Sequence, residues 1–301
     1  MEWIENKNAD KNNWDTLVTQ NTALIFNYSW YLDAVGDNWG ILFVDDKKDK
    51  GIAVSFTEKL GQKIVAPPYF HRTSSWIGNW TKQEKEIALE FIATQFKGGD
   101  FAFEEERIDK GNYYYQIIEP STNFEEAYHT QAKRMLAKAK KNAITCDNKF
   151  EKSFFLKLVV EELGKKVEMW NTAAVDKFSA LIEVLIQNNC FYFIEIKHNE
   201  KTAGGLIIMQ LENRHIYLKG ICTPEVKKLG GMYAAMDKAI SHAMEKNAIF
   251  DFGGSRVEGV ARFNHNLGGI NQFYAYKSWS EYPFWFKTLK KIRNTWKKQA
   301  K

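Results

Sequence analysis

The strongest local pattern of chemically useful residues is the run Lys-Lys-Leu-Gly-Gly-Met at 227–232, between an expected strand and an expected helix. A helix N-terminus offers unpaired N–H groups and the positive end of the helix dipole. Glycines let that backbone approach a phosphate closely, and a lysine adds positive charge. The run therefore predicts a pyrophosphate site formed by Lys227, Lys228, Gly230, Gly231 and Met232. A plain turn before a helix is the alternative, because short glycine motifs also occur by chance.

A second pattern begins where an apolar run ends in an acid and a glycine-dense loop follows. Glycines at such a place permit unusual backbone angles or close approach of a ligand, and loops on rigid scaffolds often carry sites. The acid could act as a base or orient the loop; capping of the N–H groups of its own turn is the alternative. An amide or backbone N–H nearby could hold an oxyanion. The residues singled out are Asp251, Gly253, Gly254, Ser255, Phe263 and Asn264.

Other residue types carry no comparable pattern. The six histidines have no metal-ligand spacing, and the three cysteines lie far apart without a CxxC pair. We therefore expect no metal, no disulfide framework and a reducing compartment. The sequence has neither a Ser-His-Asp order nor a nucleophile elbow. Five cations at 133–141, Arg134 among them, are interpreted as a solvated helix face or as a contact with tRNA or a sugar phosphate.

The elements that would position these residues occur twice in the same order. In the first half we expect strands at 39–45, 51–57 and 63–66, a helix at 81–96 opened by a capping box, and strands at 101–105 and 113–118. In the second half we expect a meander at 191–197, 203–211 and 215–219, a helix at 231–246, and strands at 249–252 and 272–279. Equivalent starts are offset by about 150 residues, which indicates one unit used twice. Linking helices are expected at 124–143, 152–162 and 175–188.

Length and composition suit a globular protein of two domains. At about 150 residues per domain the length suggests two, and 45% hydrophobic with 26% charged residues excludes disorder as the main state. The net charge is +5, but the residues from 283 on hold seven bases and no acid, which leaves −2 for the rest. The charge is therefore weak support for a body that binds nucleic acid. The tail could lie on an anionic membrane surface or pack as a helix with snorkelling lysines.

These residues together resemble the FemAB-like acyltransferases, which have two tandem GNAT domains. The resemblance rests on Gly-Gly-Met at 230–232, Phe-Asp-Phe-Gly-Gly-Ser at 250–255, Gly-Val-Ala-Arg-Phe-Asn at 259–264 and Leu-Gly-Gly at 267–269, with weaker matches at 26–32, 66–69 and 134–139. It implies an α/β (α+β) protein with two GNAT-like domains, each a mixed, mostly antiparallel sheet flanked by helices. The expected domains are 1–125 and 126–282, followed by a basic aromatic helix at 283–301.

The resemblance also implies a function. We expect an N-acyltransferase that moves an acyl group from acyl-CoA or acetyl-CoA to a small-molecule amine or amino sugar, in cell-envelope or polysaccharide metabolism. An aminoacyl-tRNA-dependent transferase of the Fem type is one alternative. A non-catalytic binding protein is another, because Met232 and Asn264 depart from the family pattern. The expected location is the cytoplasm, with peripheral contact at the inner membrane face through 283–301.

The predicted roles divide these residues into three groups. The predicted catalytic residues are Asp251, Phe263 and Asn264. The donor would bind at 227–232. The acceptor would bind between the domains near Tyr28, Trp30 and Tyr69, and the substrate-binding set is completed by Lys219, Arg134, Gly253, Gly254 and Ser255.

Overall fold

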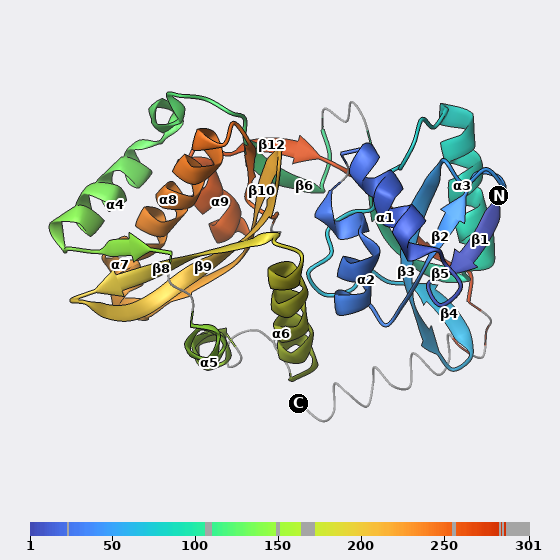
Figure 1. The fold of residues 1–301 in the computed structure, drawn as a ribbon, viewed down its shortest axis with the longest axis horizontal. Helices are drawn as coiled ribbons and strands as arrows, with labels where there is room; N and C mark the ends of the chain where they lie inside the picture. The colour runs from blue at the N-terminus through green and yellow to red at the C-terminus, as the bar shows by residue number, and fades with distance from the viewer. Residues whose placement is uncertain are drawn as a thin grey trace. The chain divides into compact units, whose positions relative to one another are not determined.

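Two compact units divide the chain: unit 1 is Met1–Glu106 with Ala275–Lys301, and unit 2 is Arg107–Tyr274 (Figure 1). The computed structural model describes every residue except 23, 106–109, 149–150, 164–171, 255–256, 283, 285 and 287–301. Most of the predicted tail helix at 283–301 therefore lies outside the described residues. Within the described residues, no helix combines the length and the apolar character needed to cross a bilayer.

Unit 1 is a mixed sheet with helices on both faces. Its strand order is β1-β2-β3-β4-β5-β13, and the β4–β5 pair is parallel. Alternate residues of a strand point to opposite faces. Trp14 and Val18 accordingly pack on one face with Ile41, whereas Ala88 packs on the other with Leu42. The strands are β1 (Glu2–Glu5), β2 (Asn38–Phe43), β3 (Gly51–Lys59), β4 (Gln62–Val65), β5 (Gly98–Phe103) and β13 (Ala275–Ser280), and the helices are α1 (Lys11–Gln20), η1 (Ile25–Asn27), α2 (Ser29–Val35) and α3 (Lys82–Gln95).

Both halves of the predicted capping box are present at the start of α3. Oγ1 of Thr81 accepts a hydrogen bond from N of Glu84, and the Glu84 carboxylate accepts one from N of Thr81. The same carboxylate pairs with Lys50 at 2.9 Å. These contacts, the lysine first, lower the pKa of Glu84 to about 2. The sequence prediction of this helix is confirmed.

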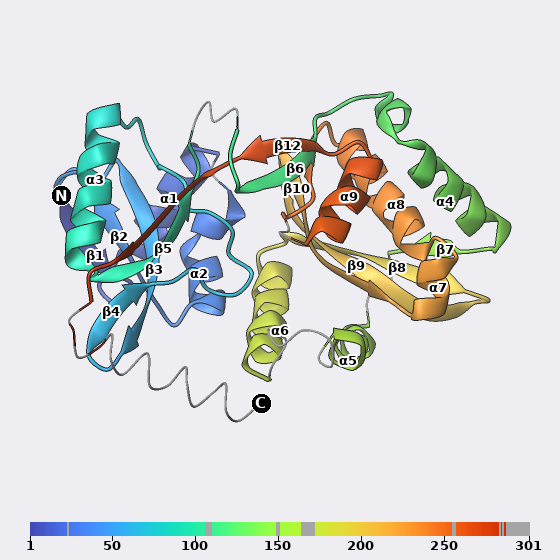
Figure 2. The same cartoon turned by 180° about the vertical axis from the view of Figure 1, so that it is seen from behind.

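Unit 2 is a second mixed sheet, with strand order β12-β6-β11-β10-β9-β8-β7. The ribbon shows α4 and α8 on one face and α5 and α6 on the other (Figure 2). The predicted meander and the helix after it are confirmed as β8 to β10 and α8. The strands are β6 (Tyr114–Ile118), β7 (Thr145–Asp147), β8 (Phe191–His198), β9 (Lys201–Leu211), β10 (Arg214–Cys222), β11 (Ile249–Asp251) and β12 (Ile270–Phe273), and the helices are η2 (Phe124–Ala127), α4 (Thr130–Lys141), α5 (Lys152–Leu163), α6 (Thr172–Gln187), α7 (Pro224–Lys228), α8 (Gly231–Glu245) and α9 (Glu258–Asn266).

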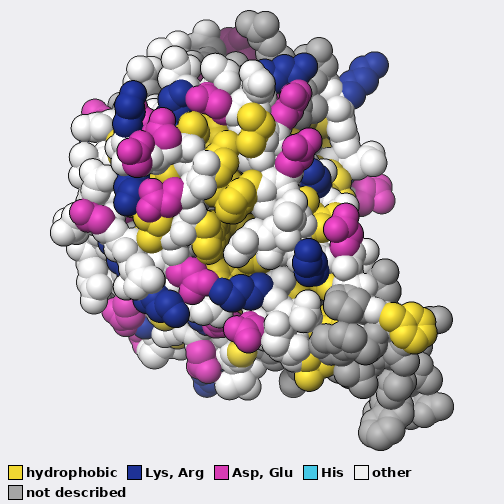
Figure 3. Space-filling view, turned by 90° about the vertical axis from the view of Figure 1, so that its right-hand side faces the viewer, with side chains coloured by type: hydrophobic (Ala, Val, Ile, Leu, Met, Phe, Trp, Pro, Cys, Tyr) yellow, Lys and Arg dark blue, Asp and Glu magenta, His cyan; other side chains and the backbone are white. Residues whose placement is uncertain are grey.

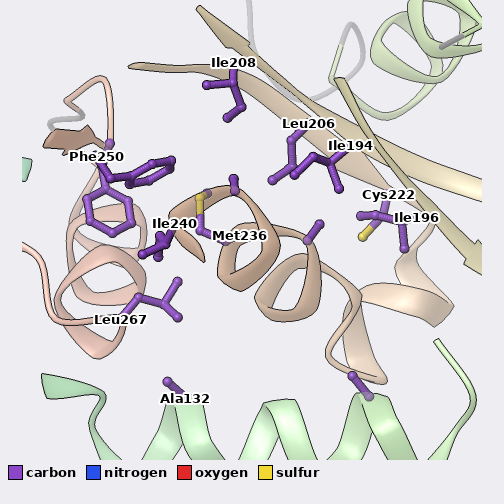
Figure 4. Packing of buried hydrophobic residues seen from close by; sticks show 14 of the residues in the cluster. Ala132, Ile194, Ile196, Leu206, Ile208, Cys222, Met236, Ile240, Phe250 and Leu267 are labelled. Carbon is purple, nitrogen blue, oxygen red and sulfur yellow. The ribbon is translucent and has the colours of Figure 1, made fainter. Parts of the chain in front are cut away.

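Helix α8 forms the centre of the unit 2 core. Met236 and Ile240 lie between the sheet residues Ile194 and Leu206 on one side and Ala132 of α4 on the other (Figure 4). All five side chains are almost completely buried. The core therefore fixes α8 between the sheet and α4.

The two sheets exchange strands, which the sequence does not predict. The expected first-half strand at 113–118 is β6, which pairs with β11 and β12 in unit 2. The expected second-half strand at 272–279 is divided: β12 stays in unit 2, and β13 pairs antiparallel with β5 in unit 1. The compact units thus differ from the predicted division at residue 125, because strand partners depend on distant chain segments.

The glycine-dense stretch after β11 is a helix where a loop was predicted. Helix α9 carries Phe263 and Asn264. Gly259 lies in its first turn, and the glycines at 268 and 269 follow its end. The glycines therefore lie in the first turn of the helix or beyond its end, and none interrupts its middle.

Charges of both signs are mixed on one face of unit 1 (Figure 3), whereas helix α4 of unit 2 carries positive charges. Basic and acidic groups are interspersed on the face of unit 1 seen in Figure 3. By contrast, α4 of unit 2 carries five cations and no acid. Those cations are Lys133, Arg134, Lys138, Lys140 and Lys141, and all five are exposed.

Candidate functional site

The short strand β11 pairs in parallel with only the first three residues of β10, and this opens the sheet. Register contacts join Arg214, His215 and Ile216 to Ile249, Phe250 and Asp251, after which β11 ends. Strand β10 continues to Cys222 with β9 on its other side. The chain turns away after β11 at Gly253, whose φ is 77°. A side chain does not fit at this position, because its Cβ would lie 2.3 Å from O of Tyr217. One edge of β10 beyond Tyr217 is thereby left without β11.

A pocket of about 960 Å³ lies along this open part of β10. Its walls come from β10, α7, the start of α8 and α9, with Gln131 of α4 at one side. Lys219, Lys227, Met232, Phe263 and Asn264 are the predicted site residues that line it. All belong to unit 2. The structure therefore brings these five together around one cavity.

The charge of the pocket lining is of one sign. Lys219, Lys227 and Arg262 line it, and no Asp or Glu is among its described lining residues. Burial lowers the pKa of the Lys219 ammonium to about 8. A lining of this kind suits an anionic ligand, because phosphate oxygens would meet cations and no repelling carboxylate.

Asn264 is the most unusual polar residue of the pocket. Its side chain is 1% exposed, and neither Oδ1 nor Nδ2 has a hydrogen-bond partner. An unpaired buried polar group typically costs about 1–3 kcal/mol, so most are paired in folded proteins. The ring of the preceding residue, Phe263, packs against Tyr233 at 4.6 Å between centroids. Asn264 thus combines an unused donor and acceptor with a fixed position.

The glycine pair before α8 serves packing. Gly230 has φ of 96°, and a Cβ there would lie 2.3 Å from O of Met135 in α4. A Cβ on Gly231 would lie 2.4 Å from the side chain of Val226. Neither glycine lines the pocket, nor does exposed Lys228. Of the predicted pyrophosphate run, Lys227 and Met232 reach the pocket.

Asp251 lies apart from the pocket lining. Its side chain is 0% exposed. Oδ2 accepts a hydrogen bond from Nη1 of Arg214 at 2.9 Å, and Oδ1 accepts one from N of Gly253 at 2.9 Å. The carboxylate therefore ties the ends of two strands together and caps its own turn. Gly253 and Gly254 both have positive φ, and Ser255 lies outside the described residues.

Arg134 is joined to the pocket through one neighbour. Its Nη2 donates to Oε1 of Gln131 at 2.6 Å, and Gln131 lines the pocket. Arg134, one of the exposed cations of α4, therefore lies next to a residue of the pocket lining.

The predicted acceptor residues lie together in unit 1. The rings of Tyr28 and Trp30 are stacked with centroids 5.4 Å apart, and Trp30 contacts Tyr31 at 6.1 Å. Oη of Tyr31 donates to O of Phe70 at 2.6 Å, and Phe70 is in ring contact with Tyr69. These aromatic residues therefore form one cluster.

The equivalent opening in unit 1 is filled by the chain itself. Parallel β4 and β5 meet only at Val65 and Gly99. Between β3 and β5, N of Ser74 donates to O of Ala102 at 3.0 Å, and Oγ of Ser74 donates to O of Ala53 at 2.7 Å. Among the described residues, the open strand edge that borders a pocket therefore belongs to unit 2.

Sequence reasoning missed several residues of the pocket. Tyr217, Cys222, Tyr233 and Asn266 line it but were not singled out. The signal for Tyr217 and Cys222 would have been the end of the meander, and that for Tyr233 the first turn of the helix after it; Asn266 is the last residue of α9. Among the described residues, no group of three or more His, Cys, Asp or Glu side chains is arranged to hold a metal ion.

Solved structures match this architecture over almost its whole length. A crystal structure of FemX aligns with 93% of this chain and 97% of its own at 13% identity, with a TM-score of 0.66. L-PGS from Bacillus licheniformis aligns with 91% and 93% at 12% identity and a TM-score of 0.57. A tandem GNAT protein from the clavulanic acid biosynthesis pathway covers 94% and 99% at 6% identity and a TM-score of 0.52. The fold is the FemAB-like tandem GNAT fold.

Sequence comparison alone does not reach this result. No protein-family model matches the chain, and no curated protein does. At identities of 6–13%, this likeness shows the fold alone. Any functional assignment must therefore rest on the residues around the unit 2 pocket.

Proposed function

We propose that the protein transfers an acyl or aminoacyl group from a phosphate-bearing donor in the unit 2 pocket to an amine. The observation that carries this proposal is Asn264, a buried amide with both polar atoms unpaired, in a pocket lined by cations. Attack of an amine on an acyl carbon forms a tetrahedral oxyanion, which hydrogen-bond donors stabilise. Nδ2 of Asn264 would donate to that oxygen, and Lys227 and Arg262 would contact phosphates.

The cations of α4 favour aminoacyl-tRNA as the donor. A nucleic acid extends beyond its reactive end, and its phosphates need cations outside the pocket. Arg134, Lys138 and Lys141 provide them on one exposed helix face. The glycine pair at 230–231 packs closely against Met135 and Val226, and neither glycine lines the pocket. Tyr28, Trp30 and Tyr69 are proposed to hold the acceptor, a small amine or amino sugar.

Acyl-CoA is the second donor candidate. It also carries phosphates, and the name of the tandem GNAT structure refers to AcCoA. Met232, at the start of α8, bears on this choice because its side chain lies over Gly220 of β10. Its Cε would be 2.9 Å from a Cβ placed on that glycine. A CoA donor would therefore have to bind beside this methionine.

Equilibrium binding of acyl-CoA species, charged tRNA and uncharged tRNA tests the proposal. We expect charged tRNA to bind, and Arg262→Gln to weaken binding about tenfold. Lys228→Gln is the matched control, because it removes an exposed cation that does not line the pocket. Failure of every donor to bind would refute the transferase assignment.

A second measurement separates the two donors. Replacing Arg134, Lys138 and Lys141 together by Gln should reduce the dependence of log Kd on log salt for tRNA by about 2–3. Binding of acyl-CoA should be unchanged. Acyl-CoA that binds and is turned over, with no tRNA binding, would assign the donor to CoA instead.

A further inference from the structure

Lys219 reaches the unit 2 pocket because β10 contains a bulge. Tyr217 pairs with Ile208, and Lys219 pairs with the very next residue of β9, Ile207. One residue of β10, Leu218, is therefore extra at this point. Bulges of this kind re-aim the side chains that follow and are common beside active sites.

The bulge places Lys219 on the opposite side of the sheet from Tyr217. Ile208, the partner of Tyr217, belongs to the core formed with α8. Ile207, the partner of Lys219, also pairs with Phe193, whose ring contacts Phe155 of α5. Side chains directly opposite each other in a ladder share one face. Lys219 therefore lies on the α5 face while still lining the pocket, with Met232 and Asn264 reaching it from the α8 side.

We propose that Lys219 is the general base that takes a proton from the acceptor amine during acyl transfer. The inference rests on the proposed function and assigns a proton-transfer step to this site. The acceptor would approach the acyl carbon through the opening in the sheet from the α5 face. The phosphates of the donor would lie on the α8 side, near Lys227.

The proton balance of this step is complete. The ammonium of the acceptor gives one proton to neutral Nζ of Lys219, and the resulting amine attacks the acyl carbon, so a C–N bond forms. The intermediate loses its second amine proton to the leaving oxygen or sulfur as the C–O or C–S bond breaks. Lys219 then returns its proton to water.

The surroundings of Lys219 suit a base. Burial lowers its pKa to about 8, so a useful fraction is neutral near pH 7, as efficient general bases require. The other titratable groups of the pocket are Tyr217, Cys222, Lys227, Tyr233 and Arg262. On α5, which lies on its side of the sheet, the described charged side chains are those of Lys152, Lys157 and Glu161. Lys152 pairs with Glu183, and Lys157 with Glu161.

An NMR titration of the full chain with ¹³Cε-labelled lysine tests the proton affinity directly. The signal lost in Lys219→Arg, or in Lys219→Gln if the first variant does not fold, identifies the residue. We expect its midpoint near pH 8, about two units below an ordinary lysine. If the signal shows that Lys219 stays protonated to about pH 10, the proposal is overturned, whether or not a donor is known.

Turnover with the donor that binds tests the role. Arginine keeps the charge but cannot accept a proton at these pH values. We therefore expect Lys219→Arg and Lys219→Gln both to lower kcat at least about 100-fold with little change in KM, and to abolish the rise of kcat/KM toward pH 8. Full activity of Lys219→Arg would show that Lys219 serves as a phosphate-binding cation and would overturn the proposal. If the wild-type protein is inactive with every donor, the proposed function is refuted. The NMR titration needs no donor, so it still measures the pKa of Lys219.

Discussion

Nη1 of Arg214 lies 2.9 Å from Oδ2 of Asp251, so the first residue of β10 is tied to the last residue of β11. Both side chains are sheltered, with Arg214 18% and Asp251 0% exposed. The pair lies at the point where the two strands begin to separate. The ion pair links the start of β10 to the end of β11, and we propose that it holds the open edge of β10 in place.

Asp251→Asn should therefore lower the free energy of unfolding by about 3 kcal/mol. Asparagine keeps the shape and can still accept from N of Gly253, but it leaves the guanidinium of Arg214 without its counter-charge. Urea unfolding followed by circular dichroism measures the change. Asp147→Asn is the matched control, because that half-exposed carboxylate pairs with Lys197 at the surface and should contribute less than about 1 kcal/mol. Equal stability of both variants with wild type would contradict the structural role.

Gly230→Ala should destabilise the protein by about 2 kcal/mol or more. Its φ of 96° suits glycine, and the new methyl group would meet O of Met135 at 2.3 Å. Gly259→Ala serves as the control, since no atom lies within 4 Å of a Cβ placed there and alanine favours a helix by about 0.5–1 kcal/mol over glycine. Thermal unfolding of the two variants should shift in opposite directions. A neutral Gly230→Ala would remove the packing explanation for this glycine.

The sequence predicts the elements of unit 2 well because their signals are local. The meander at 191–219 and α8 have clear apolar periods and turn residues, so their types follow from neighbours in the chain. The partners of β6 and β13 depend on segments more than a hundred residues away. Nothing local distinguishes a strand that stays in its own sheet from one that joins the other.

The candidate site shows the same limit. The glycine pair at 230–231 looks alike in the sequence whether it cradles a phosphate or packs closely, and only the structure shows that a Cβ at these positions would meet Met135 and Val226. The partner of Asp251 is Arg214, 37 residues away, and this pairing has no local signal in the sequence. Asn264 follows from the family resemblance, but its unpaired amide depends on the tertiary packing around α9. Local patterns therefore select candidate residues, whereas the burial and the partners of those residues depend on the tertiary structure.

Lys219→Met should make the protein more stable near pH 7 by about 2 kcal/mol. The folded state lowers the pKa of Lys219 to about 8, so an unfolded chain binds more protons between about pH 8 and pH 10. Stability of the wild type must therefore rise over that interval, because the buried lysine has lost its charge in the folded state while the unfolded chain still holds the proton. The advantage of the methionine variant should shrink accordingly and be largely lost above about pH 10. Urea unfolding of both proteins across this range measures the difference, and a gap independent of pH would show that Lys219 keeps its ordinary proton affinity.

Asn264→Leu should stabilise the ligand-free protein by about 1–3 kcal/mol while abolishing transfer, because leucine removes a buried amide whose two polar atoms have no partner. Asn27→Leu is the opposite case and the matched control. Asn27 is 0% exposed, its Nδ2 donates to O of Leu24 and Oγ of Ser75, and its Oδ1 accepts from N of Ser75. Loss of these bonds should cost about 3 kcal/mol. Chemical unfolding and turnover of both variants should therefore separate an asparagine kept for a ligand from one kept for the fold. If Asn264→Leu loses as much stability as Asn27→Leu, then Asn264 is a structural residue and Nδ2 is not reserved for the oxyanion.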